Sequence, residues 1–192
     1  MTPKEILQRK IFTPDECHHI MAMKQQVRQY LLNSSSMEKV LLDPSIHLKD
    51  IIVAGGCYYS TLHNTAPNDI DVFVLNRTRQ LSPDVLPLIR NPYKDIKTGA
   101  YLNNPNVVES FIVFEEPHPK MNYIITMYKT REEMIAEFDY LHCCVSYNLD
   151  SGVVFISRDV YNAICNKKLI INNKKHLQPY RRDKFLDKGF KE

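Results

Sequence analysis

Residues Ile51–Leu75 read IIVAGGCYYSTLHNTAPNDIDVFVL, and this stretch decides the fold. It holds two apolar runs, each with the length and composition of a buried β-strand. The first run ends in Gly55 and Gly56, where backbone amides can approach an anion closely because no Cβ intervenes. The second carries Asp69 and Asp71 at alternate positions, so both carboxylates project from one face of the strand. The stretch therefore predicts a phosphate-binding turn followed by a carboxylate pair.

A carboxylate pair in this arrangement suits Mg²⁺, which proteins commonly hold through one or two carboxylates together with water and phosphate oxygens. The carboxylates of Asp69 and Asp71 would repel each other unless a cation joined them. Two solvated acids on a surface strand are the structural alternative, but the glycine pair ahead of them favours a functional role. We therefore interpret Asp69 and Asp71 as catalytic residues and as ligands of one or two Mg²⁺ ions, with a nucleoside triphosphate as substrate.

The chain has 192 residues, of which 44% are hydrophobic and 24% charged, as expected for a globular domain with a sizeable core. Because it has neither a signal-peptide pattern nor an apolar run near the ~18 residues of a membrane span, we expect no membrane partner and a cytoplasmic location. Five cysteines, an odd number without a C-x-x-C pair, argue against disulfides and structural zinc. The net charge of +3 is compatible with a polyanionic partner such as RNA.

We expect three parts along the chain. Residues 1–50 should form helices that pack on a sheet, residues 51–165 the core, and residues 166–192 a basic segment that ends in a helix. Within the core, the Phe138–Asn148 segment is predicted to be helical. Residues 76–106 are rich in proline, asparagine and charge, which indicates irregular structure.

The remaining elements are predicted from local patterns. Thr13, followed by a proline and two acids, predicts one helix start, and Thr130, followed three residues later by Glu133, predicts another. Short helices are predicted over Met37–Leu42, Tyr58–His63, Val160–Cys165 and Tyr180–Gly189, and strands over Val107–Glu115, Asn122–Tyr128 and Val153–Ile156.

The order Gly55-Gly56, twelve residues, then Asp69-Ile70-Asp71 resembles the signature of the DNA polymerase β-like nucleotidyltransferase superfamily. Within it, the chain is most similar to the head domain of class II tRNA nucleotidyltransferases and bacterial poly(A) polymerases. Its basic tail also resembles that of small nucleotidyltransferase-like proteins of phages and bacteria. The resemblance runs from about Ile51 to the C-terminus. It implies an α/β (α+β) fold, in which a small mixed β-sheet of the polymerase β palm type is flanked by helices.

The resemblance also implies roles for single residues. The phosphates of the nucleotide would contact Gly55, Gly56 and the Ser60 hydroxyl, and Asp139 would contact the base or sugar unless it merely caps its own helix. The C-terminal helix would close the cleft over the nucleotide with Arg181 and Lys184, which share one helical face while Arg182 points elsewhere. The implied reaction is transfer of a nucleoside monophosphate to the 3′ end of a tRNA or other RNA, or to another hydroxyl acceptor.

The chain departs from the family pattern at several positions. Tyr59 stands where the family has an arginine, and Ser60 stands where it has an aspartate. The strand expected to carry a third carboxylate offers Asn122 instead, although Glu109, Glu115 and Glu116 lie nearby in the sequence. Two alternatives therefore stay open: a catalytically degenerate nucleotidyltransferase fold that serves as a binding or structural protein, and transfer onto a protein or small molecule.

Overall fold

The structure is a computed structural model that describes residues 11–85, 88, 92–93, 104–114 and 119–192. The strands are β1 (Ile51–Ala54), β2 (Asp69–Val74), β3 (Pro92–Tyr93), β4 (Val107–Val113), β5 (Lys120–Thr126), β6 (Ser146–Asn148) and β7 (Val154–Phe155). The α-helices are α2 (Pro14–Leu32), α3 (Ser35–Val40), α4 (Cys57–Leu62), α5 (Arg131–Ala136), α6 (Arg158–Cys165) and α7 (Pro179–Asp187), and short 3₁₀ turns occur at η1 (Leu48–Asp50), η3 (Leu141–Cys143) and η4 (Lys174–His176).

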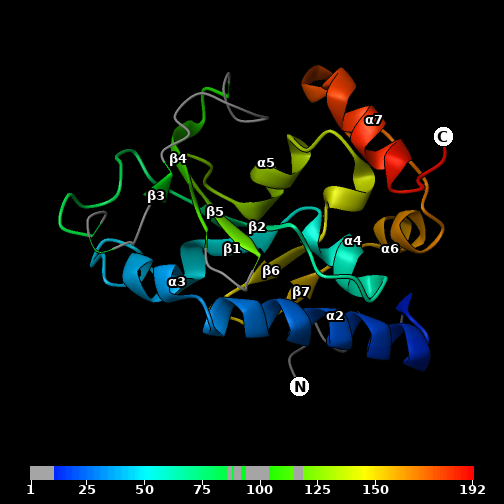
Figure 1. The fold of residues 1–192 in the computed structure, drawn as a ribbon, viewed down its shortest axis with the longest axis horizontal. Helices are drawn as coiled ribbons and strands as arrows, with labels where there is room; N and C mark the ends of the chain where they lie inside the picture. The colour runs from blue at the N-terminus through cyan, green and yellow to red at the C-terminus, as the bar shows by residue number, and fades with distance from the viewer. Residues whose placement is uncertain (1–10, 86–87, 89–91, 94–103, 115–118) are drawn as a thin grey trace.

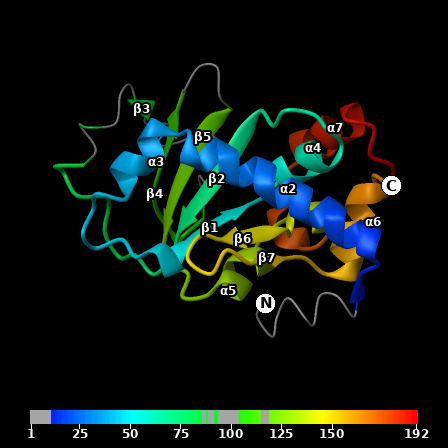
Figure 2. The same cartoon turned by 90° about the horizontal axis from the view of Figure 1, so that it is seen from below.

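The strands form one seven-stranded sheet in the order β3-β4-β5-β2-β1-β6-β7 (Figure 1). The central pair of β2 and β5 is parallel, whereas every other neighbouring pair is antiparallel. Helices lie against both faces of this sheet (Figures 1 and 2). The predicted class, a small mixed sheet flanked by helices, is thereby confirmed. None of the helices in the described part of the chain is long and apolar enough to cross a membrane.

The N-terminal helices cover one face of the sheet, and α2 runs across the strands as a long diagonal (Figure 2). As predicted, Thr13 caps α2: its side chain accepts from the amide of Glu16, and the Glu16 carboxylate accepts from the Thr13 amide at 2.7 Å. The buried positions of α2 recur at helical spacing, so one stripe of the helix packs on the main core. These positions are Ile20, Met23, Val27 and Leu31.

The opposite face of the sheet is only partly covered. Alternation along β2 directs Ile70, Val72 and Val74 into the main core, so Asp69, Asp71 and Phe73 project from the other side. There a smaller apolar cluster forms around Phe73 and includes Met134 of α5. α7 lies on this same side of the sheet, to one side of α5 (Figure 1). The two aspartates thus stand at the edge of a face that the helices leave partly open.

The prediction of a helix over Phe138–Asn148 is wrong. Only the three residues of η3 are helical there, and the segment then runs into β6. The reason is a long-range pairing: Ser146, Tyr147 and Asn148 pair with Ala54, Val53 and Ile52 of β1. Pairing with the apolar β1 strand requires an extended chain, and it overrides the local helical pattern.

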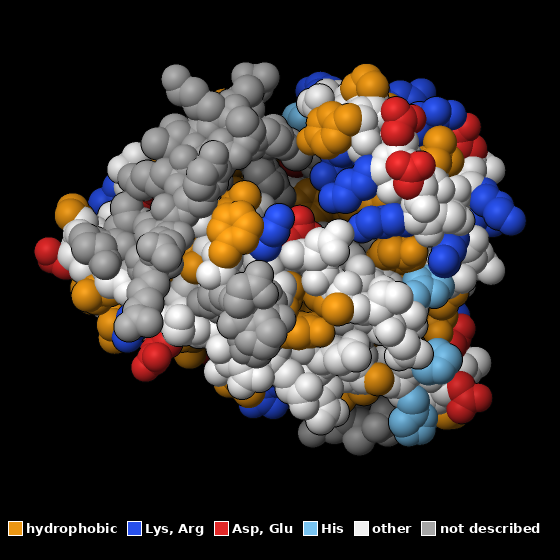
Figure 3. All heavy atoms as spheres, in the orientation of Figure 1, with side chains coloured by type: hydrophobic (Ala, Val, Ile, Leu, Met, Phe, Trp, Pro, Cys, Tyr) orange, Lys and Arg blue, Asp and Glu red, His pale blue; other side chains and the backbone are white. Residues whose placement is uncertain are grey.

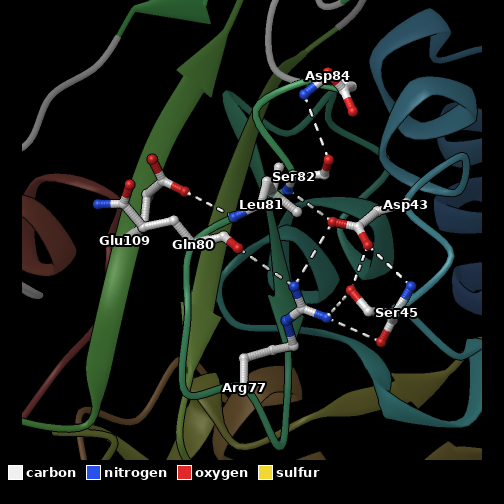
Figure 4. Close-up of polar contacts among 8 residues, drawn as sticks. All are labelled: Asp43, Ser45, Arg77, Gln80, Leu81, Ser82, Asp84 and Glu109. Carbon is white, nitrogen blue, oxygen red and sulfur yellow. Dashed lines mark hydrogen bonds and ion pairs between the residues drawn. The ribbon is translucent and has the colours of Figure 1, made fainter.

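The loop after β2 is held by a buried polar network (Figure 4). Arg77 is 6% exposed and Asp43 2% exposed. The Arg77 guanidinium donates to the Ser45 hydroxyl at 2.6 Å and to the Ser45 carbonyl at 2.9 Å, and it lies 3.6 Å from the Asp43 carboxylate. The Ser82 amide donates to that same carboxylate at 2.8 Å. The network joins the segment after α3 to the residues that follow β2, away from the open face.

Candidate active site

A cleft of about 320 Å³ opens on the partly covered face of the sheet, and all eight residues that the sequence singled out line it. They come from four places: the turn between β1 and α4 with the first turn of α4, the strand β2, the segment after α5, and the helix α7. Lys and Arg side chains gather over α7 on this side of the molecule (Figure 3). The eight residues are Gly55, Gly56, Ser60, Asp69, Asp71, Asp139, Arg181 and Lys184. The fold therefore brings them together, and their individual roles stay predictions.

The carboxylates of Asp69 and Asp71 lie on the floor of the cleft. On the neighbouring strand β5, Asn122 stands directly opposite Asp71 and donates from Nδ2 to Asp71 Oδ1 at 2.8 Å. Burial and the adjacent negative charge of Asp69 raise the pKa of Asp71 to about 7, although the Asn122 hydrogen bond acts in the opposite direction. Two ionised carboxylates are thus costly here, and a bound cation would remove that cost.

Gly55 and Gly56 serve different purposes in the turn after β1. Gly55 has φ +97°, and a Cβ at this position would lie 2.8 Å from Asp71 Oδ2. Only glycine therefore leaves the Asp71 carboxylate where it is. Gly56, with φ −71°, is the N-cap of α4, and a Cβ there would meet no atom within 4 Å. The space beside Gly56 is open cleft, as the prediction of a close phosphate approach requires.

The described residues offer no third carboxylate to the aspartate pair. They contain no group of three or more His, Cys, Asp or Glu side chains that could hold a metal ion. Glu109 lines no part of the cleft; its carboxylate accepts from the Leu81 amide at 3.3 Å (Figure 4). Glu115 and Glu116 lie outside the described residues. Asp69 and Asp71 nevertheless fit Mg²⁺, which needs only one or two carboxylates when phosphate and water complete its coordination.

Asp139 and Arg181, which both line the cleft, pair with each other. Arg181 donates from Nε to Asp139 Oδ2 and from Nη2 to Oδ1 at 3.0 Å, a bidentate arrangement. The Tyr140 amide also donates to Asp139 Oδ1 at 2.9 Å. Asp139 is 4% exposed, so this is a largely buried ion pair. Asp139 does not cap a helix: the 3₁₀ turn η3 that follows has Tyr140 as its N-cap and no side-chain cap hydrogen bond.

Sequence reasoning missed two groups that line the cleft. The first is Lys188, the C-cap of α7, which follows Lys184 by four residues, a spacing that could have revealed it. The second is an apolar wall beside the aspartates, contributed by strands, loops and α5, for which no local signal exists. This wall comprises Phe73, Val107, Ile112, Tyr128, Met134 and Phe138.

Comparison with solved structures supports the fold. A structure described as the complex of a CCA-adding enzyme with ATP matches with a TM-score of 0.52 and 12% sequence identity, over 84% of this chain and 37% of that chain. The Thermotoga maritima CCA-adding enzyme complexed with tRNA matches with a TM-score of 0.47 and 12% identity, over 78% of this chain and 36% of that one. This chain therefore spans little more than a third of the length of these proteins, and the first likeness supports a nucleotidyltransferase-like fold.

Comparison with curated protein sequences finds no match. Comparison with protein families matches residues 21–167 to the family described as Gabija anti-defense 2 (Gad2). The matched range includes β1, β2 and β5, together with the glycine turn, both aspartates and Asp139, and ends before α7. Because the match spans most of the sequence, this chain is a member of the Gabija anti-defense 2 family.

Proposed function

We propose that this protein is a Mg²⁺-dependent nucleotidyltransferase that transfers a nucleoside monophosphate from a nucleoside triphosphate to a hydroxyl acceptor. One observation carries the proposal: Asp69 and Asp71 share one face of β2 in a cleft that also holds an open glycine turn and the cationic side of α7. The combination provides adjacent sites for a metal ion and for phosphate groups, which is what nucleotidyl transfer requires.

The chain's own residues would bind and orient the reactants. Asp69 and Asp71 would hold the metal, and the Asn122 amide fixes the position of the Asp71 carboxylate by its 2.8 Å hydrogen bond. Gly56 leaves room for the phosphates beside the Ser60 hydroxyl. The bound Mg²⁺ would neutralise phosphate charge and lower the pKa of the acceptor hydroxyl. The apolar wall offers a surface on which a planar base can pack.

Nucleotidyl transfer consumes only the nucleoside triphosphate and the acceptor hydroxyl, and no other reagent is needed. The acceptor oxygen forms a bond to the α-phosphorus, while the bond from that phosphorus to the bridging oxygen breaks. Pyrophosphate leaves with the bonding electron pair, and the hydroxyl proton is released to solvent. The protein contributes by holding the triphosphate and the acceptor in line and by offsetting the charge of the departing pyrophosphate.

Two kinds of hydroxyl group are candidate acceptors for this transfer. The family name describes an anti-defense role toward Gabija, and we propose that nucleotidyl transfer is the chemistry behind that role. An RNA 3′ end is one candidate acceptor, since a solved structure with a similar fold is that of a CCA-adding enzyme. A hydroxyl group of a Gabija protein is the other. Both would receive the same α-phosphoryl group.

Radiolabelled nucleotides test this proposal. The protein would be incubated with Mg²⁺ and each of the four NTPs, labelled at the α- or the γ-phosphate, together with cellular RNA or purified Gabija proteins. We expect α-label to join the RNA or protein and γ-label to appear in pyrophosphate. Asp71→Asn should abolish both signals, whereas Asp150→Asn should not, since Asp150 is an exposed residue of the β6–β7 turn.

A non-catalytic binding role is the second candidate, and one observation favours it. The position beside Asp71 on β5 carries the amide of Asn122 rather than a carboxylate. A binding protein would retain Mg²⁺-dependent affinity for NTP but would release no pyrophosphate and transfer no label to RNA or protein. That outcome would exclude the transferase proposal.

A further inference from the structure

Helix α7 presents one continuous face to the cleft. Arg181, Lys184, Phe185 and Lys188 all line the cleft, and their spacing of three, four and seven residues places them on one side of the helix. Three cations thus face the aspartate pair. Arg182 lies off this face, as the sequence predicted, and its guanidinium instead pairs with Glu192 at 2.7 and 2.8 Å.

The first of these cations, Arg181, bonds to other side chains of the protein. Its bidentate pair with the buried Asp139 is joined by a contact from Nη2 to the Cys143 sulfur at 3.8 Å. The Asp139 carbonyl in turn accepts from the amides of Asn172 and Asn173 at 2.7 and 3.2 Å. Asp139 is therefore a fixed point, and Arg181 ties the first turn of α7 to it.

Contacts made by Phe185 and by Tyr59 hold the C-terminal end of α7 in place. Phe185 is 3% exposed and packs edge-on against His142, with ring centroids 4.2 Å apart. The Tyr59 hydroxyl donates to the Lys188 carbonyl at 3.1 Å, and the Tyr59 ring lies 4.8 Å from that of Phe190. The helix is thus held at both ends, so the residues between and beyond these anchors have a defined position over the cleft.

The ammonium groups of Lys184 and Lys188, by contrast, carry no hydrogen bond or ion pair to any described residue. Lys188 is partly buried, and its ammonium lies 5.9 Å from the Tyr59 ring and 6.0 Å from the Phe185 ring. Loss of hydration, together with the positive charge of Lys184, lowers the pKa of Lys188, against an opposing effect of Asp69. Two cations that line one cleft without a hydrogen-bonding or ionic partner among the described residues favour the binding of an anion there.

We propose that Lys184 and Lys188 form the polyphosphate site of the cleft, which takes the β- and γ-phosphates of the nucleotide, and that Arg181 is a positioning residue that holds α7 in place. This inference rests on the proposed function and refines it, because it moves the phosphate contact from Arg181 to Lys188. The ligand chemistry is that of a flexible chain of phosphates, which an ammonium group binds as a point charge.

Calorimetric titration of the full chain with inorganic tripolyphosphate in the presence of Mg²⁺ tests the lysine pair without any transfer reaction. We expect Lys184→Gln and Lys188→Gln each to weaken tripolyphosphate binding by about tenfold, as the loss of one charge-assisted contact would. Binding of a nucleoside monophosphate should change less than threefold. Lys175→Gln is the matched control, since Lys175 is exposed in η4 and lies outside the cleft.

The role of Arg181 is tested by a double-mutant cycle with Asp139. If Arg181 acts through Asp139, then Arg181→Gln and Asp139→Asn weaken tripolyphosphate binding to a similar extent, and the double variant is no weaker than either. A direct phosphate contact predicts the opposite for Asp139→Asn, which would free the guanidinium and leave binding intact or strengthened. If the Gln variant does not fold, Arg181→Lys keeps the charge but loses the bidentate pair, and it should weaken binding likewise.

The outcomes separate this inference from the proposed function. Lysine-dependent tripolyphosphate binding without label transfer would uphold the site and overturn the transferase. Label transfer with an unchanged KM for NTP in both lysine variants would uphold the transferase and overturn the site. Equal, small losses in Lys184→Gln, Lys188→Gln and Lys175→Gln would also overturn it, because they would show only a general effect of surface charge.

Discussion

The absence of a side chain at Gly55 makes room for the carboxylate of Asp71. A Cβ at Gly55 would lie 2.8 Å from Asp71 Oδ2, and the residue has φ +97°. The glycine turn and the carboxylate pair, thirteen to sixteen positions apart in the sequence, are therefore one structural unit. The position of the candidate metal ligand depends on the backbone that precedes it.

Gly55→Ala should disturb both the backbone and the candidate metal site. The positive φ costs an L-residue about 1–2 kcal/mol of unfolding free energy, and the added Cβ displaces the Asp71 carboxylate. We expect a lower midpoint in urea unfolding and weaker Mg²⁺-dependent NTP binding by calorimetry. A variant as stable as the wild type, with unchanged NTP affinity, would show that the contact between residues 55 and 71 has no consequence.

Gly56→Val should separate nucleotide binding from stability. The new side chain enters open cleft space and meets no protein atom at its Cβ, so the unfolding free energy should change by no more than about 0.5 kcal/mol. Phosphates that approach the turn closely would collide with it, and we expect NTP affinity to fall at least about tenfold. Retained affinity in a folded variant would place the phosphates elsewhere in the cleft.

Asn122→Asp should make the thermal stability of the protein more dependent on a bound metal ion. The change replaces the donor that bonds Asp71 at 2.8 Å with a third negative charge. Repulsion should lower the melting temperature in EDTA, and Mg²⁺ or Mn²⁺ should then raise it by more than in the wild type. Asn162→Asp, at an exposed position of α6, is the control and should respond to neither. An equal response to metal in wild type and Asn122→Asp would argue against a cation at this position.

Because the His142 ring is buried, we expect the free energy of unfolding to fall in mild acid. The ring is 0% exposed, neither of its nitrogens has a hydrogen-bond partner among the described residues, and burial lowers its pKa from 6.5 to about 3. The unfolded chain therefore binds this proton more readily between pH 3 and pH 6.5, so the unfolding free energy falls as the pH drops below 6.5. This residue alone should account for about 1.4 kcal/mol between pH 7.5 and pH 5.5.

His142→Leu is the variant that isolates this effect. Other titrating groups are common to both proteins, so the difference between their urea unfolding free energies at pH 7.5 and pH 5.5 reports the histidine. We expect the variant to lose less stability on acidification. Parallel pH profiles for the two proteins would mean that His142 titrates alike in the folded and unfolded chain.

Much of the fold and of the site's composition could be predicted from local sequence. The apolar runs ending in Gly55 and carrying Asp71 form adjacent strands as predicted, because their patterns match buried strands. The cap at Thr13 is likewise a local signal. Prediction failed where a long-range partner determines the secondary structure. The Phe138–Asn148 segment was expected to be helical, but its last three residues pair with β1 as a strand.

The pairing of side chains within the cleft could not be predicted from the sequence either. Asp139 and Arg181 were both expected to face the nucleotide, yet they lie 42 positions apart and bond to each other. The four-residue spacing from Lys184 could have suggested Lys188, but its place in the cleft depends on the position of α7, which the packing of Phe185 and Tyr59 determines. Residue types could be assigned to the site from the sequence, but their partners could not.

Calorimetric titration of NTP in the presence of Mg²⁺ or of EDTA tests whether Asp69 and Asp71 hold a metal ion that binds the nucleotide. We predict Mg²⁺-dependent binding that weakens at least about tenfold in Asp69→Asn and in Asp71→Asn, but not in Asp150→Asn, with circular dichroism spectra unchanged. Nucleotide affinity that neither EDTA nor the substitution of either aspartate alters would contradict a metal ion held by this pair.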